Sequence, residues 1–220
     1  MAPFGTIYSY PNNPRVLRVE VIADMNGLEL ELGEYEFGVT NKTPDFLAKF
    51  PLGKVPAFES ADGLCLVESV AIARYVAQSG PRADQLLGED AKTQALIEQW
   101  VVFSEAELSL NVIVPVLMRG LNIWEYEEKR YKTHFDALMR DAKYLDKILE
   151  GGKKYLVGDQ YTLADIMVCS FMYWASKFIF SAELRKQLPN LAAYIKAFAS
   201  VEVHKKHFGE LLLNGLPNSH

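Results

Sequence analysis

Two neighbouring residues, Glu68 and Ser69, carry groups that suit a small charged ligand. They stand between a β-rich run and a helical run, so Ser69 is expected to cap the helix. The N–H groups and positive dipole end at a helix start attract an anion, and the Glu68 carboxylate attracts an ammonium group. A zwitterion would find both partners there. Taken alone, the pair is better explained as a plain cap beside a solvated glutamate.

The cysteines and histidines give little indication of a catalytic or metal site. Cys65 and Cys169 are the two cysteines, and both lie in apolar surroundings. We expect buried, reduced thiols, because isolated cysteines in a chain without an export signal indicate the cytosol. His204 and His207 are three residues apart but lack companions, which favours an exposed helix end over a metal site.

Composition narrows the class of protein. The chain has 220 residues, 50% of them hydrophobic, and a net charge of −5 with scattered lysines and arginines. A nucleic-acid footprint needs a concentrated basic face. No apolar run approaches the ~20 residues that span a bilayer, and the first five residues do not resemble a secretory signal. We therefore expect a cytoplasmic protein without nucleic-acid or membrane partners.

The first ~80 residues must position Glu68 and Ser69, and they mix strand and helix signals. Strands are expected at 6–10, 28–32, 57–59 and 64–67, and helices at 15–25, from 43 and from 69. The βαβ unit should be parallel, and Asp62-Gly63 predicts an antiparallel hairpin. We therefore predict a mixed four-stranded sheet with helices packed on it. The order of these strands and helices along the chain is that of a thioredoxin-like domain.

The remainder is typical of helices. Long helices are expected at 90–119, with Pro115 kinking its end, and at 125–150, and another helix from Pro189. Thr162 and Asp165 resemble a capping box before an apolar helix. The predicted organisation is an α/β domain at 1–80, a linker at 81–88 and an all-helical domain at 89–220.

Two motifs carry a family resemblance. The stretch 50–59, followed by Asp62-Gly63 and 68–72, resembles the glutathione-site signature of cytosolic glutathione transferases. The stretch 155–159 with 162–165 resembles the buried folding motif of their helical second domain. Residues 41–47, 49–51 and 53–59 are also similar to the amino-terminal domain of the gamma subunit of translation elongation factor 1B. Since this chain ends at His220, it is expected to be either a free-standing fungal-type transferase or the excised domain of a longer subunit.

The resemblance implies a glutathione site with a cis Val55-Pro56 bond. Val55 would pair with the cysteinyl backbone of glutathione as an added strand pairs with a sheet edge. The alternative is an ordinary trans proline starting an edge strand. Glu68 and Ser69 would hold the γ-glutamyl ammonium and carboxylate groups. Lysines and an amide would hold the glycyl end, in this order of preference: Lys54, Lys42 and Asn41.

The residue that activates the thiol is left open between two candidates. The thiolate is the nucleophile, so a transferase must lower the thiol pKa from ~8.5. Asn13 lies near the position of the catalytic serine of theta-like transferases, although asparagine is also an ordinary turn residue and cap. Ser9 is the second candidate, and Arg15 could supply charge. With no cysteine at residues 8–18, a mixed-disulfide mechanism is disfavoured.

The helical domain would supply the electrophile pocket. Phe103, Glu107 and Asn111 share a helix face at four-residue spacing, although packing with a solvated edge is the simpler interpretation. The predicted function is conjugation of glutathione to small hydrophobic electrophiles by a homodimer. Alternatives are a docking domain for a translation-factor partner and a non-catalytic carrier of hydrophobic ligands.

Overall fold

The computed structural model describes residues 3–211. The chain divides into two compact units, Met1–Leu87 and Gly88–His220. The segment expected to be a linker contains a short helix, α4 (Ala83–Leu87), that belongs to the first unit.

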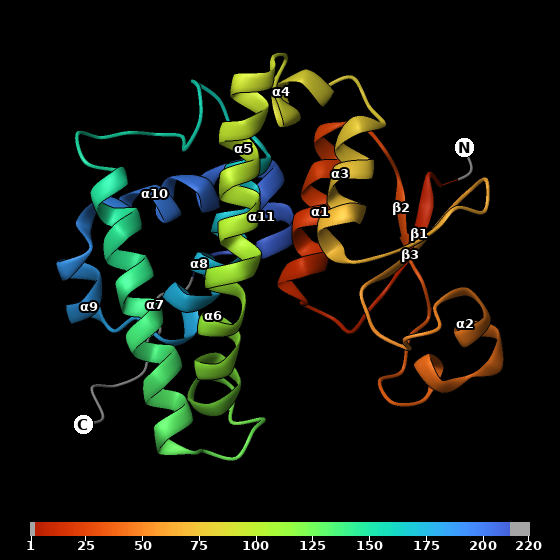
Figure 1. Ribbon diagram of the computed structural model, residues 1–220, viewed down its shortest axis with the longest axis horizontal. Helices are drawn as coiled ribbons and strands as arrows, with labels where there is room; N and C mark the ends of the chain where they lie inside the picture. Colours follow the sequence, from red (N-terminus) through yellow and green to blue (C-terminus); the bar gives the residue numbers. More distant parts are fainter. Residues whose placement is uncertain (1–2, 212–220) are drawn as a thin grey trace. The chain divides into compact units, whose positions relative to one another are not determined.

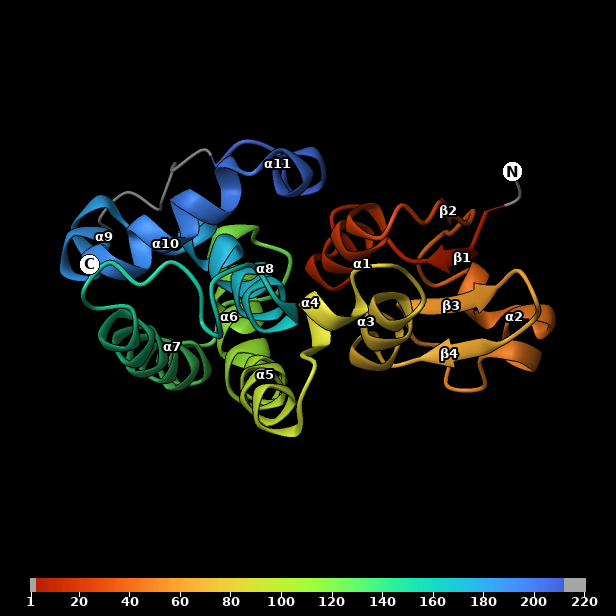
Figure 2. The same cartoon turned by 90° about the horizontal axis from the view of Figure 1, so that it is seen from above.

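The first unit is a four-stranded sheet with helices on both faces (Figure 1). The strand order is β2-β1-β3-β4; β1 pairs parallel with β2 and antiparallel with β3, and β3 pairs antiparallel with β4. Helices α1 and α3 cover one face and α2 the other (Figure 2). The mixed sheet and the thioredoxin-like order agree with the sequence prediction. The elements are β1 (Gly5–Tyr8), α1 (Pro14–Met25), β2 (Leu30–Leu32), the 3₁₀ helix η1 (Thr40–Lys42), α2 (Pro44–Lys49), β3 (Ala57–Ser60), β4 (Cys65–Val67) and α3 (Ser69–Gln78).

Local chemistry explains where two of these helices begin. Asn13 and Thr43 occupy the N-cap positions of α1 and α2, and each side chain accepts a backbone N–H of the first turn. Each cap is followed by a proline, whose missing N–H costs nothing at the first helical position. Strand β1 ends at Tyr8, two residues earlier than predicted, because the chain turns toward α1 there.

Side chains alternate between the two faces of the sheet. Tyr8 and Ala57 pack with Phe46 and Phe50 of the α2 region. Phe58, the next residue along β3, is fully buried and contacts Tyr75 of α3. Each helical layer is therefore held by one set of alternating strand residues.

The described part of the second unit has helices and no strand, and it is built around α8 (Leu163–Phe178), in which fourteen of the sixteen residues are buried. The other helices are α5 (Ala91–Phe103), α6 (Ser109–Pro115), α7 (Glu128–Ile148), α9 (Ala182–Gln187), α10 (Pro189–Ser200) and α11 (Glu202–Phe208). The fold class predicted from the sequence is thus confirmed in both units.

The long helix expected at 90–119 is one helical run with a π segment in its middle and a second π segment at its end. The π segments are η2 (Ser104–Leu108) and η3 (Val116–Gly120). The second begins directly after Pro115, which cannot donate to the α-helical ladder, and a wide-turn bond runs from Leu121 N–H to the Val116 carbonyl at 2.8 Å. The run Ala91–Gly120 is long and apolar enough by length and composition to cross a membrane, although charged residues interrupt it and no continuous apolar run in it approaches about 20 residues. Half of its apolar window is buried inside the structure, as in a core helix.

Candidate functional site

The sheet register brings the ends of three strands to one place. Tyr8 pairs with Ala57, and Ala57 pairs with Val67, so these residues form a row across β1, β3 and β4. Neighbouring strands lie about 4.8 Å apart, so the row spans roughly 10 Å. Ser9, Pro56 and Glu68 are each one residue beyond it at the same edge of the sheet. Residues that are far apart in the sequence therefore converge here.

The centre of this edge is the Val55-Pro56 segment. The peptide bond between these residues is cis, as the resemblance implied. Pro56 is buried and Val55 is half-buried, packed against the core of Phe46, Phe50 and Ala57.

One side of the edge is the start of α3. Glu68 occupies the N-cap position with φ 66°, ψ 109° and no side-chain capping bond, and it is exposed. The expectation that Ser69 caps the helix was wrong, because Ser69 is already the first helical residue. Its hydroxyl is buried and accepts a hydrogen bond from Arg18 Nη2 at 2.6 Å. The first-turn N–H groups of α3 thus have no side chain of their own at the cap.

Arg18 is a site residue that the sequence analysis missed. It is fully buried within α1 and connects α1 to the start of α3 through Ser69. The available signal was its spacing, four residues before the buried Ile22 on the same helix face.

On the other side of Pro56, a loop carries the two predicted lysines. Lys42 and Lys54 are both exposed. Asn41 accepts a hydrogen bond from the Gly38 N–H at 2.9 Å and donates to the Gly53 carbonyl at 2.8 Å, so it joins the two parts of this loop. Gly53 has φ 58°, and a Cβ there would lie 2.7 Å from the Asn41 carbonyl oxygen. Glycine is thus required next to Lys54.

The third part of the edge is the turn between β1 and α1, which holds Ser9, Asn13 and Arg15. Asn13 is 1% exposed, whereas Ser9 is half-buried. Asn13 Nδ2 donates to Ser9 Oγ at 2.9 Å, and Asn13 Oδ1 accepts the Arg15 N–H at 3.0 Å. Burial raises the pKa of the neighbouring Tyr10, and the Arg15 charge opposes the shift. The phenol is therefore kept protonated.

The three predicted pocket residues all contact α7 within the second unit. The Phe103 ring lies 5.7 Å from that of Tyr144, and Glu107 forms a 2.8 Å ion pair with Arg140. Asn111 donates to Asp141 Oδ2 at 3.1 Å. These contacts favour the packing interpretation, and the role of the three residues in a pocket stays a prediction.

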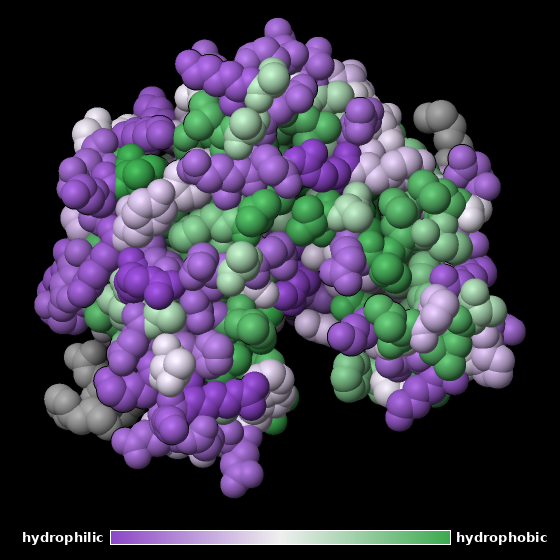
Figure 3. Space-filling model, viewed as in Figure 1, coloured by the Kyte–Doolittle hydropathy of each residue, from purple (hydrophilic) through white to green (hydrophobic). Residues whose placement is uncertain are grey.

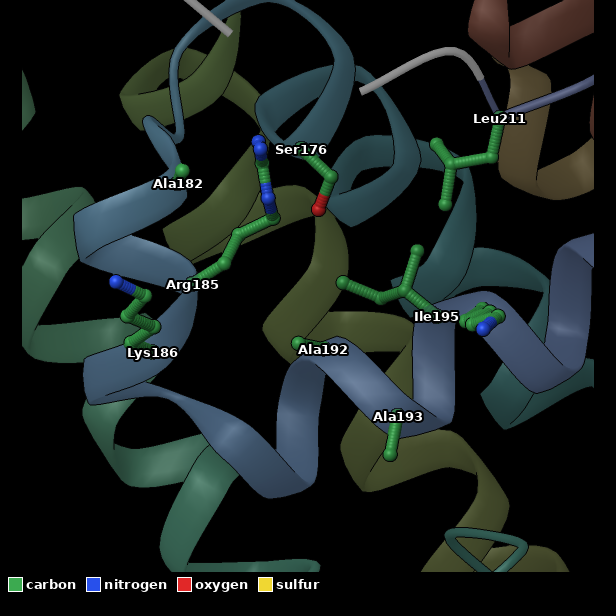
Figure 4. Close-up of a pocket in the computed structure, with 9 residues that line it drawn as sticks. Ser176, Ala182, Arg185, Lys186, Ala192, Ala193, Ile195 and Leu211 are labelled. Atoms are coloured by element: carbon green, nitrogen blue, oxygen red, sulfur yellow. The ribbon is translucent and has the colours of Figure 1, made fainter. Parts of the chain in front are cut away.

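A cleft in the second unit lies among α8, α9 and α10 and has a volume of about 290 Å³ (Figure 4). Arg185 and Ser176 lie along one side of it, and Ile195 and Leu211 along another. Its lining includes Lys186 and Lys196, and it contains none of the residues predicted from the sequence to bind glutathione.

Two expectations about reactive residues needed correction. His204 is 1% exposed rather than at an exposed helix end, stacked on Phe198 with a 2.8 Å hydrogen bond to the Phe198 carbonyl. Burial lowers the pKa of His204 to about 4. Cys169 is buried as expected, and burial raises its thiol pKa, whereas Cys65 is only half-buried. Within residues 3–211, no group of three or more His, Cys, Asp or Glu side chains could hold a metal ion.

Comparison with protein families decides the family. Residues 3–78 match the glutathione S-transferase N-terminal domain, and residues 93–202 match the glutathione S-transferase C-terminal domain. The chain belongs to the glutathione S-transferase family. The recognition made from the two sequence motifs is thereby confirmed.

Similar proteins fall into two groups. A glutathione S-transferase-like protein LUC7 from a Fusarium species is 44% identical over 95% of this chain and 94% of its own length. Elongation factor 1-gamma-A from Xenopus laevis is 35% identical over 95% of this chain but only 47% of its own length. This glutathione S-transferase family member thus spans about half of the elongation factor.

Solved structures share the fold. A theta class glutathione S-transferase from Xanthomonas axonopodis pv. citri, with glutathione bound, has a TM-score of 0.81 and 23% identity, covering 94% of this chain and 98% of its own. The glutathione transferase URE2P6 from Phanerochaete chrysosporium, in complex with oxidized glutathione, has a TM-score of 0.84 and 19% identity, covering 96% and 97%.

Proposed function

We propose that this protein is a glutathione transferase that conjugates glutathione to small hydrophobic electrophiles. The observation that supports it is the row Tyr8–Ala57–Val67, which brings the β1–α1 turn, the Val55-Pro56 bend and the start of α3 to one sheet edge. Two helix N-termini, those of α1 and α3, follow directly from the turn and from Glu68. Their partial positive charge suits a tripeptide with two carboxylates and a thiolate.

Each group of glutathione has a complementary partner at this edge. The γ-glutamyl carboxylate would accept hydrogen bonds from the backbone N–H groups at the start of α3 and from the Ser69 hydroxyl. The ammonium group of the same γ-glutamyl residue would pair with Glu68. The cysteinyl backbone would pair with the N–H and C=O of Val55. Lys54 is the first choice for the glycyl carboxylate, with Lys42 second, on the loop that Asn41 holds together.

The experiment that tests this proposal measures turnover and binding in parallel. The protein is mixed with glutathione and 1-chloro-2,4-dinitrobenzene, and the absorbance of the conjugate is followed. Glutathione affinity is measured by calorimetry on the same sample. We expect saturable turnover above the uncatalysed rate. Binding without turnover would contradict the enzyme function and favour a non-catalytic role.

A docking role in translation is the second candidate function. It is supported by 35% identity to elongation factor 1-gamma-A across 95% of this chain. Such a domain would bind a translation-factor partner, and nothing would require it to activate a thiol. A non-catalytic carrier of hydrophobic ligands is a third, weaker alternative. Stable co-purification with elongation-factor subunits, together with absent turnover, would favour the docking role.

The proposed active form is a cytoplasmic homodimer. Apolar side chains gather on the surface over α2 and its flanking loops (Figure 3). The residues include Phe37 at 74% exposure and Leu52 at 68%. Apolar surface of this kind marks an interaction site. Light scattering should give twice the chain mass at micromolar concentration, and Leu52→Glu should shift it toward the monomer. A wild-type monomer would contradict the assembly.

A further inference from the structure

The cleft among α8, α9 and α10 contains a buried hydroxyl group without a hydrogen-bond partner. Ser176 lies near the end of α8 and is only 3% exposed. A serine in a helix usually donates to a carbonyl three or four residues earlier, as Ser170 of the same helix does to Met167 at 2.8 Å. Ser176 makes no hydrogen bond to any residue in the described part of the chain, and its oxygen points into the cleft (Figure 4). Since buried polar groups are normally paired, this hydroxyl indicates a ligand site.

The polar side of the cleft is positively charged. Arg185 lies on the same side as the serine hydroxyl, and a hydrogen bond to the Phe180 carbonyl holds its guanidinium group in position. Lys196 of α10 also lines the cleft and forms no ion pair with a described residue. Lys186 contributes less, because it lies 3.8 Å from the Glu183 carboxylate. None of the described residues that line the cleft is acidic, so an anion is favoured there over a cation.

Apolar side chains form the remaining lining. Ile195 is 1% exposed and points into the cleft across from Ser176 (Figure 4). The other apolar residues are Ala182, Ala192, Ala193 and Leu211. The volume of about 290 Å³ is that of roughly ten water molecules of ~30 Å³ each, and hence of a ligand of roughly ten non-hydrogen atoms. An apolar wall with a few converging polar groups is typical of sites for small molecules.

We propose that this cleft binds a small amphipathic carboxylate. Its carboxylate group would accept a hydrogen bond from the Ser176 hydroxyl and be neutralised by Arg185 and Lys196, and its hydrocarbon chain would pack on Ile195 and Leu211. Octanoate, with about ten non-hydrogen atoms, matches the volume. This site goes beyond the proposed transferase function, since none of the residues assigned to glutathione lines it.

Calorimetry on the full chain with octanoate, 1-octanol and octylamine tests the preference for an anion. We expect saturable binding of octanoate and at least about tenfold weaker binding of the other two, which have the same chain length without a negative charge. Saturating S-hexylglutathione, which would fill the proposed glutathione and electrophile sites, should leave the octanoate affinity unchanged. Absent octanoate binding, equal binding of 1-octanol, or displacement by S-hexylglutathione overturns the inference.

Two serines of α8 provide a matched pair of variants. Ser176→Ala should weaken octanoate binding about tenfold, because a hydrogen bond to a charged group is lost. Without octanoate, it should not lower the melting temperature, because this hydroxyl has no partner among the described residues to lose. Ser170→Ala should do the reverse, lowering the melting temperature and keeping the octanoate affinity, because its hydroxyl donates to Met167 and does not line the cleft.

Two lysines separate a local charge effect from a general one. Lys196→Gln should weaken octanoate binding about threefold, whereas Lys143→Gln, which removes an exposed lysine of α7 outside the cleft, should change it by less than about twofold. Unchanged octanoate affinity in Ser176→Ala and Lys196→Gln, or an equal loss in Ser170→Ala, overturns the inference. The proposed transferase function is tested separately by turnover, so its failure is distinguishable from the failure of this site.

Discussion

Two helix starts in this protein use similar residue types in opposite ways. At the start of α8, the Asp165 carboxylate is buried and accepts hydrogen bonds from the Leu156 and Thr162 N–H groups at 2.7 and 2.9 Å. It also accepts the Tyr194 hydroxyl at 2.6 Å. At the start of α3, the Glu68 carboxylate is exposed and makes no capping bond.

We interpret the first helix start as one that stabilises the fold and the second as one that is open to a ligand. The polar groups at α8 satisfy one another, so nothing there invites a ligand. At α3 the backbone is in an unfavourable conformation for a glutamate, with φ 66°, and such conformations concentrate at functional sites. We therefore propose that the strained start of α3 is the anion-binding part of the proposed glutathione site.

The largest expected effect is on stability and comes from a substitution at the start of α8. Asp165→Ala should lower the free energy of unfolding by about 3–5 kcal/mol, because it leaves buried N–H and O–H donors unsatisfied. Chemical denaturation measures this, and Asp159→Ala, an exposed residue of the same motif, should change it by less than about 0.5 kcal/mol. Equal effects of the two variants would contradict the account of α8.

The next effect concerns ligand affinity at α3. Glu68→Ala should weaken glutathione binding by about 1.5–3 kcal/mol, since a charge-assisted contact to the ammonium group is lost. Glu68→Gln keeps the shape of the side chain and should lose most of the same affinity. Calorimetry gives both values. Unchanged binding in both variants would remove Glu68 from the site.

The buried histidine of the second unit predicts a pH effect of about 2 kcal/mol. The folded pKa of His204, about 4, is below its ordinary 6.5, so the unfolded chain binds the proton more readily. Stability should fall as the pH drops below 6.5, by about 2 kcal/mol between pH 7 and 5. His204→Gln should flatten this part of the stability profile, whereas His207→Gln should not. A profile unaffected by His204→Gln would show that His204 is not kept neutral by the fold.

The smallest effect has the opposite sign. Glu68→Gly should raise the free energy of unfolding by about 0.5–1 kcal/mol, because glycine adopts a positive φ without a Cβ penalty. The same variant should lose glutathione affinity as Glu68→Ala does. A destabilised Glu68→Gly variant would mean that the backbone at Glu68 is not strained.

The fold and part of the site could be predicted from local signals. Alternating strand residues, the Asp62-Gly63 turn and the Thr162–Asp165 capping box are short-range patterns, and the structure has the corresponding mixed sheet and capped helix. The cis bond at Val55-Pro56 came from the family motif rather than from its spacing.

What could not be predicted depended on contacts between different helices. His204 was expected at an exposed helix end, because the sequence does not show that the chain turns between α10 and α11 and stacks its ring on Phe198. The Ser69 hydroxyl was expected to cap α3, but it instead accepts a hydrogen bond from Arg18, fifty-one residues earlier in the sequence. Asn13 and Ser9 were left open as thiol-activating candidates, because their burial and the hydrogen bond between them follow only from the folded turn between β1 and α1.

The most direct test compares the two helix starts in one titration. Glutathione is added to ¹⁵N-labelled protein while the amide signals of Ser69 and Val70 are followed, with those of Asp165 and Ile166 as the internal reference. The signals at the start of α3 should shift saturably and those at the start of α8 should stay in place. Unmoved α3 signals at saturating glutathione, or shifts confined to α8, would contradict the assignment of the site.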